Sequence, residues 1–218
     1  MKSFKALLLI LIALSIVGCS KVQVNPPLST SLGYSAFENM ETINVRDASV
    51  GLVFDQKLLN AKSQQNIKMG NFQFDLGKSF AVKFIKAVSH QFKEVRIYDK
   101  AEKVRDQNVN ALMRVSLEDI DVSMDYNQGF SKVSTEGYTR LSVRAELKEV
   151  ETNRVVWVGT SQVNHTGGIE EKILTYQEAG RGFARGFDKA IDIAIGELLQ
   201  QMQKSQNLEK YFKKWENV

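Results

Sequence analysis

Residues 140–163, RLSVRAELKEVETNRVVWVGTSQV, decide the fold because they describe a two-stranded hairpin with one apolar face. In the first strand, apolar side chains alternate with polar or charged ones, at Leu141, Val143, Ala145 and Leu147. Residues 151–153 predict a turn, after which residues 154–163 return as the partner strand and carry Trp157. One buried and one wet face are typical of an antiparallel sheet.

The chain before the hairpin predicts three more strands. Residues 48–54 and 95–98 are short apolar runs, and residues 110–125 predict a long strand. The alternation in the long strand changes parity after Leu117, which predicts a β-bulge near Glu118 and Asp119. A polar loop over residues 127–136 is expected to join this strand to the hairpin.

A first helix is predicted from Asp75, a good N-cap, to about Phe92. Its apolar stripe consists of Phe80, Ala81, Phe84, Ile85 and Val88. Its lysines are expected on the solvated face: Lys83, Lys86 and Lys93. The preceding residues, 56–67, are more polar and predict a modest helix or a loop.

A second, longer helix is predicted over residues 169–203, after Gly167-Gly168, which are expected to close the sheet. Its apolar face comprises Gly180, Phe183, Ala184, Phe187, Ile191, Ala194, Ile195, Leu198 and Met202. Gly182 and Gly186 lie one turn apart, although each glycine costs helix propensity. We therefore expect this helix to approach the sheet or another helix closely.

These elements predict an α+β fold, a single domain over residues 46–218 in which an antiparallel sheet has helices packed on one face. The pattern over roughly residues 48–200, with the hairpin at 146–163, resembles modules of bacterial envelope lipoproteins. Those are the YajG-like lipoproteins and the accessory lipoproteins of the CsgG and PelC kind. The resemblance implies a role in an envelope machine, but it carries over no signature residues of the domain.

Residues 1–19, MKSFKALLLILIALSIVGC, have the layout of an export signal. Lys2 and Lys5 begin it, and its apolar run of about fourteen residues is too short to span a bilayer. Ile16-Val17-Gly18-Cys19 resembles the lipobox of bacterial lipoproteins, and Cys19 is the only cysteine. The resemblance implies a signal peptide over residues 1–18, with a diacylglyceryl group on the Cys19 thiol and an acyl chain on its amino group. The alternative is an ordinary signal peptide, or a short anchor, with a chance cysteine.

The residues after Cys19 predict where the domain is held. In bacterial lipoproteins an aspartate after the cysteine tends to retain the protein in the inner membrane, and here that residue is Ser20. The resemblance thus implies the outer membrane, with the domain facing the periplasm. Residues 19–45 contain both prolines, Pro26 and Pro27, and predict a lipidated N-terminus followed by a flexible tether.

Composition narrows the function classes. Hydrophobic residues make up 43% and charged residues 25% of the chain, as in ordinary globular proteins. The net charge is +4, but loss of Lys2 and Lys5 would leave 27 basic against 25 acidic residues, a net +2. That balance is too weak to predict nucleic-acid binding. With one cysteine, the chain forms no internal disulfide and depends on packing.

No constellation of residues predicts catalysis or metal binding. The two histidines, His90 and His165, lack the ligand spacing of a zinc site. The acidic run at residues 118–121, with Asp125, lacks the glycine of a calcium loop and is expected on the wet face of a strand. The glycine-rich run at 180–186 lies within a helix rather than after a strand, so it does not predict a phosphate site. We expect no enzyme, no metal, and no cofactor beyond the lipid on Cys19.

The C-terminal segment, residues 207–215, is the candidate docking element. It predicts an amphipathic helix with one apolar and aromatic stripe, formed by Leu208, Tyr211, Phe212 and Trp215. The stripe is flanked by Lys210, Lys213 and Lys214. Such a segment docks onto a lipid surface or a protein partner, or it packs back onto its own domain.

The sequence therefore predicts an outer-membrane lipoprotein whose periplasmic domain is an accessory or assembly subunit of an envelope complex for secretion, transport or surface-structure assembly. Its expected partners are the membrane, through the lipid, and an envelope protein or further copies of the chain. The alternative is a carrier for an acyl chain or other apolar ligand, and a hydrolase of unrecognised type is a third. A carrier needs an apolar cavity of several hundred Å³, whereas an assembly module needs a filled core and an exposed surface patch.

Overall fold

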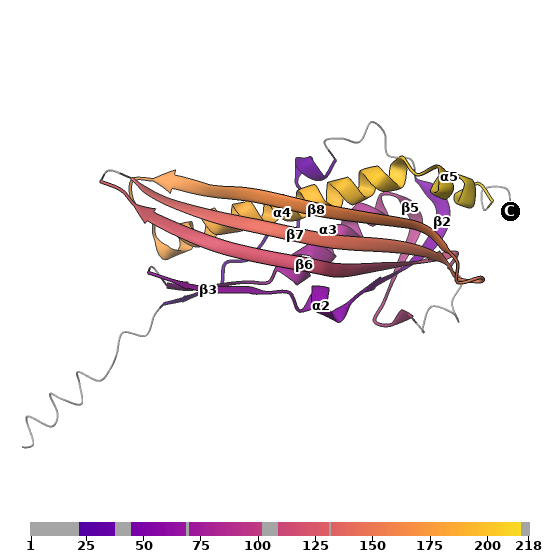
Figure 1. The fold of residues 1–218 in the computed structure, drawn as a ribbon, viewed down its shortest axis with the longest axis horizontal. Helices are drawn as coiled ribbons and strands as arrows, with labels where there is room; N and C mark the ends of the chain where they lie inside the picture. The colour runs from indigo at the N-terminus through magenta and orange to yellow at the C-terminus, as the bar shows by residue number, and fades with distance from the viewer. Residues whose placement is uncertain (1–21, 38–44, 69, 102–108, 131, 215–218) are drawn as a thin grey trace, which may run out of the picture.

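Three long strands form the body of the molecule in the computed structural model, which describes residues 22–37, 45–68, 70–101, 109–130 and 132–214. They are β6 (Ala111–Gln128), β7 (Val133–Glu149) and β8 (Val155–Glu171), joined as an antiparallel meander (Figure 1). The pairing of β6 with β7 shifts register between Leu117 and Asp119. The predicted bulge and the predicted hairpin are both confirmed.

The sheet is mixed rather than wholly antiparallel, which corrects the expected arrangement. Two shorter strands, β2 (Arg46–Phe54) and β5 (Phe92–Tyr98), complete it in the order β5-β2-β6-β7-β8. β2 pairs in parallel with both β5 and β6. Between β2 and β5 the chain passes through two helices and the hairpin of residues 63–74, and such a long crossover allows parallel pairing. The α+β class itself is confirmed.

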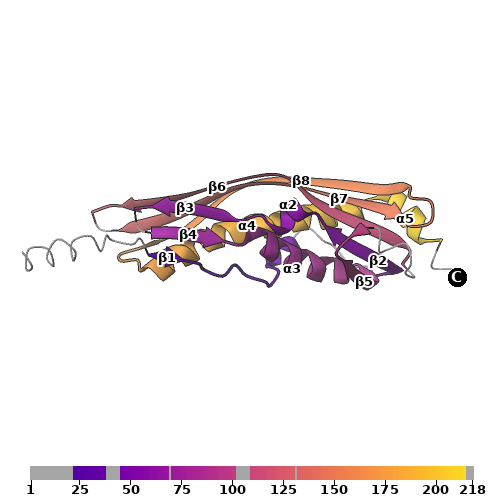
Figure 2. The ribbon, with the colours of Figure 1, turned by 90° about the horizontal axis from the view of Figure 1, so that it is seen from below.

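A small second sheet lies beside the main one, in the order β1-β4-β3 (Figure 2). It contains β1 (Gln23–Val24), β3 (Ser63–Ile67) and β4 (Gly70–Phe74). Residues 56–67 were expected as a modest helix or loop, but only one turn is helical, α2 (Gln56–Leu59), before β3 begins. Phe72 and Phe74 from β4 are fully buried and meet the rings of Phe183 and Phe187 edge to face, so the small sheet is part of the core.

The helices α3 (Leu76–Ser89) and α4 (Tyr176–Gln203) cover one face of the main sheet (Figure 1). The Asp75 side chain caps α3 as predicted, by accepting a hydrogen bond from the backbone N–H of Lys78. Thr175 and Glu178 form a reciprocal capping box at the start of α4. All nine residues of the predicted apolar face of α4 are buried.

The long helix begins later than predicted because β8 continues through Gly167-Gly168 to Glu171. Gly167 pairs with Gly137, and Gly186 of α4 lies directly above them. A Cβ atom on Gly186 would lie 2.6 Å from the Gly137 carbonyl oxygen and 2.8 Å from that of Gly167. The glycines therefore let helix and strands approach closely, which is the reason expected for Gly182 and Gly186.

The range expected as a flexible tether packs onto the domain where the structure describes it, at residues 22–37. β1 pairs with β4, and a short 3₁₀ helix, η1 (Tyr34–Ala36), places Ala36 in the core. Pro26 lies against Gly180, where an added Cβ atom would be 2.4 Å from the proline Cγ. The tether prediction is wrong for these residues because contacts distant in sequence, invisible in the local composition, hold them.

Candidate functional site: a groove between β8 and α5

The C-terminal helix α5 (Gln206–Phe212) packs its apolar side onto the domain. Leu208, Tyr211 and Phe212 are each at most 3% exposed. Phe212 meets Phe92 with 5.3 Å between ring centroids, and the Tyr211 hydroxyl donates to the Asn110 carbonyl oxygen at 2.9 Å. Of the two alternatives for this helix, packing back onto the domain is the one observed for these side chains, so they do not form a docking stripe. Trp215 lies outside the described residues.

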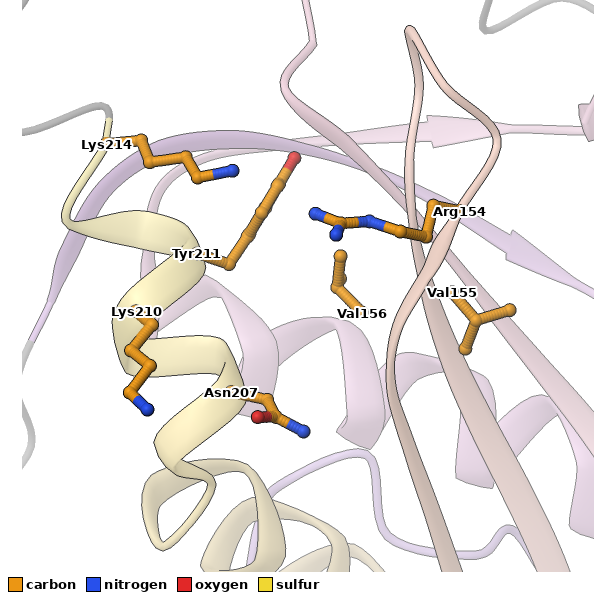
Figure 3. A pocket seen from close by; sticks show the side chains of 7 residues that line it. All are labelled: Arg154, Val155, Val156, Asn207, Lys210, Tyr211 and Lys214. Carbon is orange, nitrogen blue, oxygen red and sulfur yellow. The ribbon is translucent and has the colours of Figure 1, made fainter.

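The side of α5 next to this apolar side forms a groove with the start of β8, and Tyr211 borders both (Figure 3). The hollow has a volume of about 360 Å³ and is lined by Arg154, Val155, Val156, Asn207, Lys210, Tyr211 and Lys214. Figure 3 shows Arg154 and Lys214 reaching toward Tyr211 from opposite walls. Two of the three lysines that were expected to flank a docking stripe, Lys210 and Lys214, thus line a surface site, and Tyr211 both lines it and packs onto the domain.

Positive charge dominates this groove. The Arg154 guanidinium lies 3.7 Å from a carboxylate oxygen of Glu149, a contact at the long end for an ion pair. The Lys214 ammonium lies 5.9 Å from the centroid of the Tyr211 ring, within the range of a cation–π contact. Glu209 on the same helix is bonded to Lys213 at 2.6 Å, and this bond lowers the pKa of Glu209. The site therefore suits a carboxylate or another anionic group.

The groove also lies at one edge of the main sheet, because β8 is its last strand. Farther along this edge, the amide of Gln201 on α4 covers Thr160. It accepts from the Thr160 N–H at 3.1 Å and donates to the Thr160 carbonyl oxygen at 2.7 Å. In the groove, Val155 is 45% exposed beside the three cations. An acidic extended segment would find both charge and apolar surface there.

A buried ion cluster ties α3 and α4 to the N-terminal segment. Lys83 is fully buried, and its ammonium lies 2.9 Å from Asp188 and 3.1 Å from Asp192. The backbone N–H of Ser29 donates to both oxygens of Asp188, and that of Gly33 donates to Asp192. Burial, partly offset by Lys83, raises the pKa of Asp192 above its usual value.

Lys83 was expected to be solvated, and that expectation is wrong. Lys83 lies three residues after Phe80 and four before Ala87, so it falls on the apolar face of α3. This spacing was the available signal for burial. The two aspartates that pair with Lys83 lie more than a hundred residues away in sequence, so no local pattern could have indicated them.

The other residues considered for catalysis or metal binding, the two histidines and the acidic run of β6, lie apart from one another in the fold. His90 is the C-cap of α3 and meets Phe37 edge to face, whereas His165 lies in β8, where burial and then Lys189 lower its pKa. In the acidic run of β6, Asp119 and Asp121 both contact Arg140 of the neighbouring strand, at 3.2 and 3.7 Å. These carboxylates belong to a cross-strand ion network on an exposed face, as expected for the wet side of the strand.

Two further hollows bear on the carrier alternative. Between α2, α3, α4 and the sheet, an apolar cavity bounded by Leu58, Phe80 and Leu141, among others, has a volume of about 10 Å³. A larger hollow of about 680 Å³ lies between residues 22–27 and the first turns of α4. Its walls mix Pro26, Pro27 and Tyr176 with Gln23, Asn25, Gln177 and Arg181. This cavity between helices and sheet, formed by described residues, is therefore too small for a ligand, and the larger hollow is partly polar.

The predicted lipidation site, Cys19, lies outside the described residues. Within the described part of the chain, no helix has both the length and the hydropathy needed to cross a bilayer.

Comparison with known proteins assigns no family. No protein-family model matches the chain, and no curated protein matches it. Among solved structures, a putative neuraminyllactose-binding hemagglutinin homolog from Helicobacter pylori is 9% identical with a TM-score of 0.45, covering 81% of this chain and 96% of that one. A PelC dodecamer from Paraburkholderia phytofirmans is 20% identical with a TM-score of 0.41, covering 76% and 94%. A minor lipoprotein from Acinetobacter baumannii is 14% identical with a TM-score of 0.30, covering 77% and 96%. The structural neighbours thus include PelC and bacterial lipoproteins, at likenesses too low to argue function.

Proposed function

We propose that the chain is an exported lipoprotein, anchored through Cys19 to the outer membrane and facing the periplasm. Its domain acts there as a non-catalytic assembly module that binds an acidic segment of an envelope partner, or of another copy of the chain, in the groove between β8 and α5. The observation that carries the binding role is the convergence of Arg154 and Lys214 on an open hollow of about 360 Å³.

The filled core supports an assembly module over a carrier. The cavity of about 10 Å³ between helices and sheet is too small for an acyl chain, since small-molecule sites usually have volumes of roughly 300–1,000 Å³. The hollow of about 680 Å³ has the volume of such a site, but polar side chains such as Gln23 and Arg181 form part of its walls. The aromatic side chains that would line an apolar tunnel instead pack against one another or against aromatic residues of the strands. They are Phe80, Phe84, Phe183 and Phe187.

The groove supports recognition of negative charge. Arg154 contacts Glu149 and Lys214 lies over the Tyr211 ring, but both cations also border the open hollow, where a partner can meet them. Electrostatic complementarity at such a rim raises the association rate and selects partners by charge. Val155 and Val156 add apolar area that a partner segment can cover.

The test is site-specific photo-crosslinking in living cells, with the photoreactive residue at Asn207 inside the groove. We expect a defined adduct, whose partner mass spectrometry identifies, and a loss of at least tenfold in the Lys210→Glu/Lys214→Glu double variant. The matched control is Lys78→Glu, a charge reversal at an exposed lysine on α3. It should leave the adduct unchanged.

An adduct between two copies of the chain would make the partner a homo-oligomer contact. An adduct that forms equally well after both groove lysines are reversed would contradict recognition of an acidic segment. Absence of any adduct at Asn207, with the protein present at wild-type level, would contradict binding in the groove.

A further inference from the structure

The end of the molecule opposite α5 exposes large apolar side chains. Phe130, at the tip of the β6–β7 hairpin, is fully exposed, and Ile173, just after β8, is 81% exposed. Val22 and Tyr176 are 45% and 44% exposed. Large apolar side chains grouped at one tip of a domain mark an interaction surface.

These residues come from four segments that meet at this end. Val133 pairs with Glu171, which brings the hairpin tip next to Ile173. Tyr176 and Val22 both border Gly70, whose added Cβ atom would lie 3.8 Å from the Tyr176 ring and 2.9 Å from the Val22 carbonyl oxygen. Figure 1 shows the β6–β7 tip, the end of β8 and the start of α4 at the same end, and Figure 2 shows β1 there beside the start of α4.

The position of Cys19 in the sequence, close to Val22, points to lipid as the partner of this surface. Val22 is three residues after Cys19, so the chain between them spans about 10 Å at most, at ~3.3–3.6 Å per residue. Acyl chains on Cys19 would therefore hold the bilayer surface within reach of this end and of no other. Residues 22–37 pack along the domain, so little slack remains to move the domain away from the lipid.

We propose that this end of the domain docks directly onto the bilayer, with Phe130 and Ile173 entering the interfacial region of the lipid. The inference rests on the lipid anchor of the proposed function. Amphipathic or apolar side chains at a membrane surface add to the binding that acyl chains provide. The charges nearby are of both signs, since Lys132 pairs with Glu170, and Lys172 follows Glu171. The contact is therefore driven by apolar insertion and does not require anionic lipid.

The test uses the full-length acylated protein, purified from cells fed labelled fatty acid and reconstituted into phosphatidylethanolamine vesicles. An environment-sensitive fluorophore is attached through Gln128→Cys, two residues from Phe130, because Cys19 is then blocked by lipid. A second preparation carries it through Glu151→Cys, in the turn at the opposite end of β7 and β8. Doxyl-labelled lipid in the bilayer quenches a fluorophore at the membrane, and iodide quenches one in water.

We expect lipid quenching several-fold stronger for the Gln128→Cys probe than for the Glu151→Cys probe, with iodide showing the reverse. Phe130→Asp and Ile173→Asp together should reduce the lipid quenching to the level of the distal probe. Ile97→Asp, which alters an apolar side chain of 58% exposure on β5, should not. Addition of anionic lipid should change the result little.

Equal quenching at the two positions in acylated protein would overturn docking and leave the anchor intact. A Gln128→Cys probe shielded from both quenchers would mean that protein covers this end, such as a second copy, and would also overturn a lipid contact. Protein that carries no fatty-acid label would overturn the anchor itself, and the docking inference with it.

Discussion

The ammonium of Lys83 illustrates how single side chains hold distant segments of this chain together. It pairs with Asp188 and Asp192 on α4, and the same two aspartates accept hydrogen bonds from the backbone of Ser29 and Gly33. The cluster therefore joins α3, α4 and the N-terminal segment. A buried ion cluster of this kind is costly to break, because removal of one partner leaves the others charged and unpaired.

Replacement of Lys83 by methionine is predicted to lower the free energy of unfolding by about 3–5 kcal/mol, because it leaves Asp188 and Asp192 without their cation. Denaturant unfolding of the domain measures the loss. Lys78→Met, at an exposed lysine on the same helix, is the control and should unfold near the wild-type midpoint.

Adding Asp192→Asn to Lys83→Met should recover part of that stability, since one unpaired charge is then removed. If Lys83→Met unfolded at the wild-type denaturant concentration, the cluster would not have the role assigned to it.

Among the elements, α5 has two faces with different tasks. Its apolar face closes the core at the end of the main sheet, where Arg46 also lies over the rings of Phe92 and Phe212. Its outer face supplies the lysines of the groove. The helix is too short to be stable alone in water, so the groove exists only because the apolar face is packed.

Phe212→Ala is predicted to cost about 3–5 kcal/mol of stability, the usual range for loss of a buried phenylalanine. Thermal and denaturant unfolding of the variant give the loss, and Lys213→Ala at the neighbouring exposed position is the control. A Phe212→Ala protein that melts with the wild type would show that α5 is only loosely attached and that the groove lacks a fixed wall.

The sequence correctly predicted those features that depend only on neighbouring residues. The cap at Asp75, the bulge after Leu117 and the apolar face of α4 are each written in a few neighbouring residues. The parallel partners of β2 and the packing of residues 22–37 depend on contacts far apart in sequence, and composition alone made the latter resemble a linker.

The candidate site was predicted only in part, because it too depends on contacts between segments far apart in sequence. The amphipathic pattern of residues 207–215 correctly indicated a helix, observed over Gln206–Phe212, but an apolar stripe looks the same whether it meets a partner or its own core. Only the position of α5 against Phe92 and Asn110 decides between these. Arg154 begins the predicted strand over residues 154–163, and no local pattern distinguishes it as part of a site.

The whole molecule is elongated, with the N-terminal strand and the exposed Phe130 at one end and the groove at the other (Figure 1). β8 runs between the two ends with 17 residues, a length of about 55 Å at ~3.3 Å per residue. A domain attached to lipid at its N-terminal end would present the groove that far from the bilayer. This arrangement suits a subunit that reaches from a membrane to a partner.

The lipid anchor is the premise on which the proposed arrangement depends, and labelling of Cys19 tests it most directly. Cells that produce the wild type or Cys19→Ser are fed labelled palmitate, and the protein is recovered from separated outer membranes, inner membranes and periplasm. We predict label in the wild type, recovered in the outer membrane, and none in Cys19→Ser, which should stay uncleaved or be released. A wild-type protein without label, or equal outer-membrane recovery of both forms, would contradict the account.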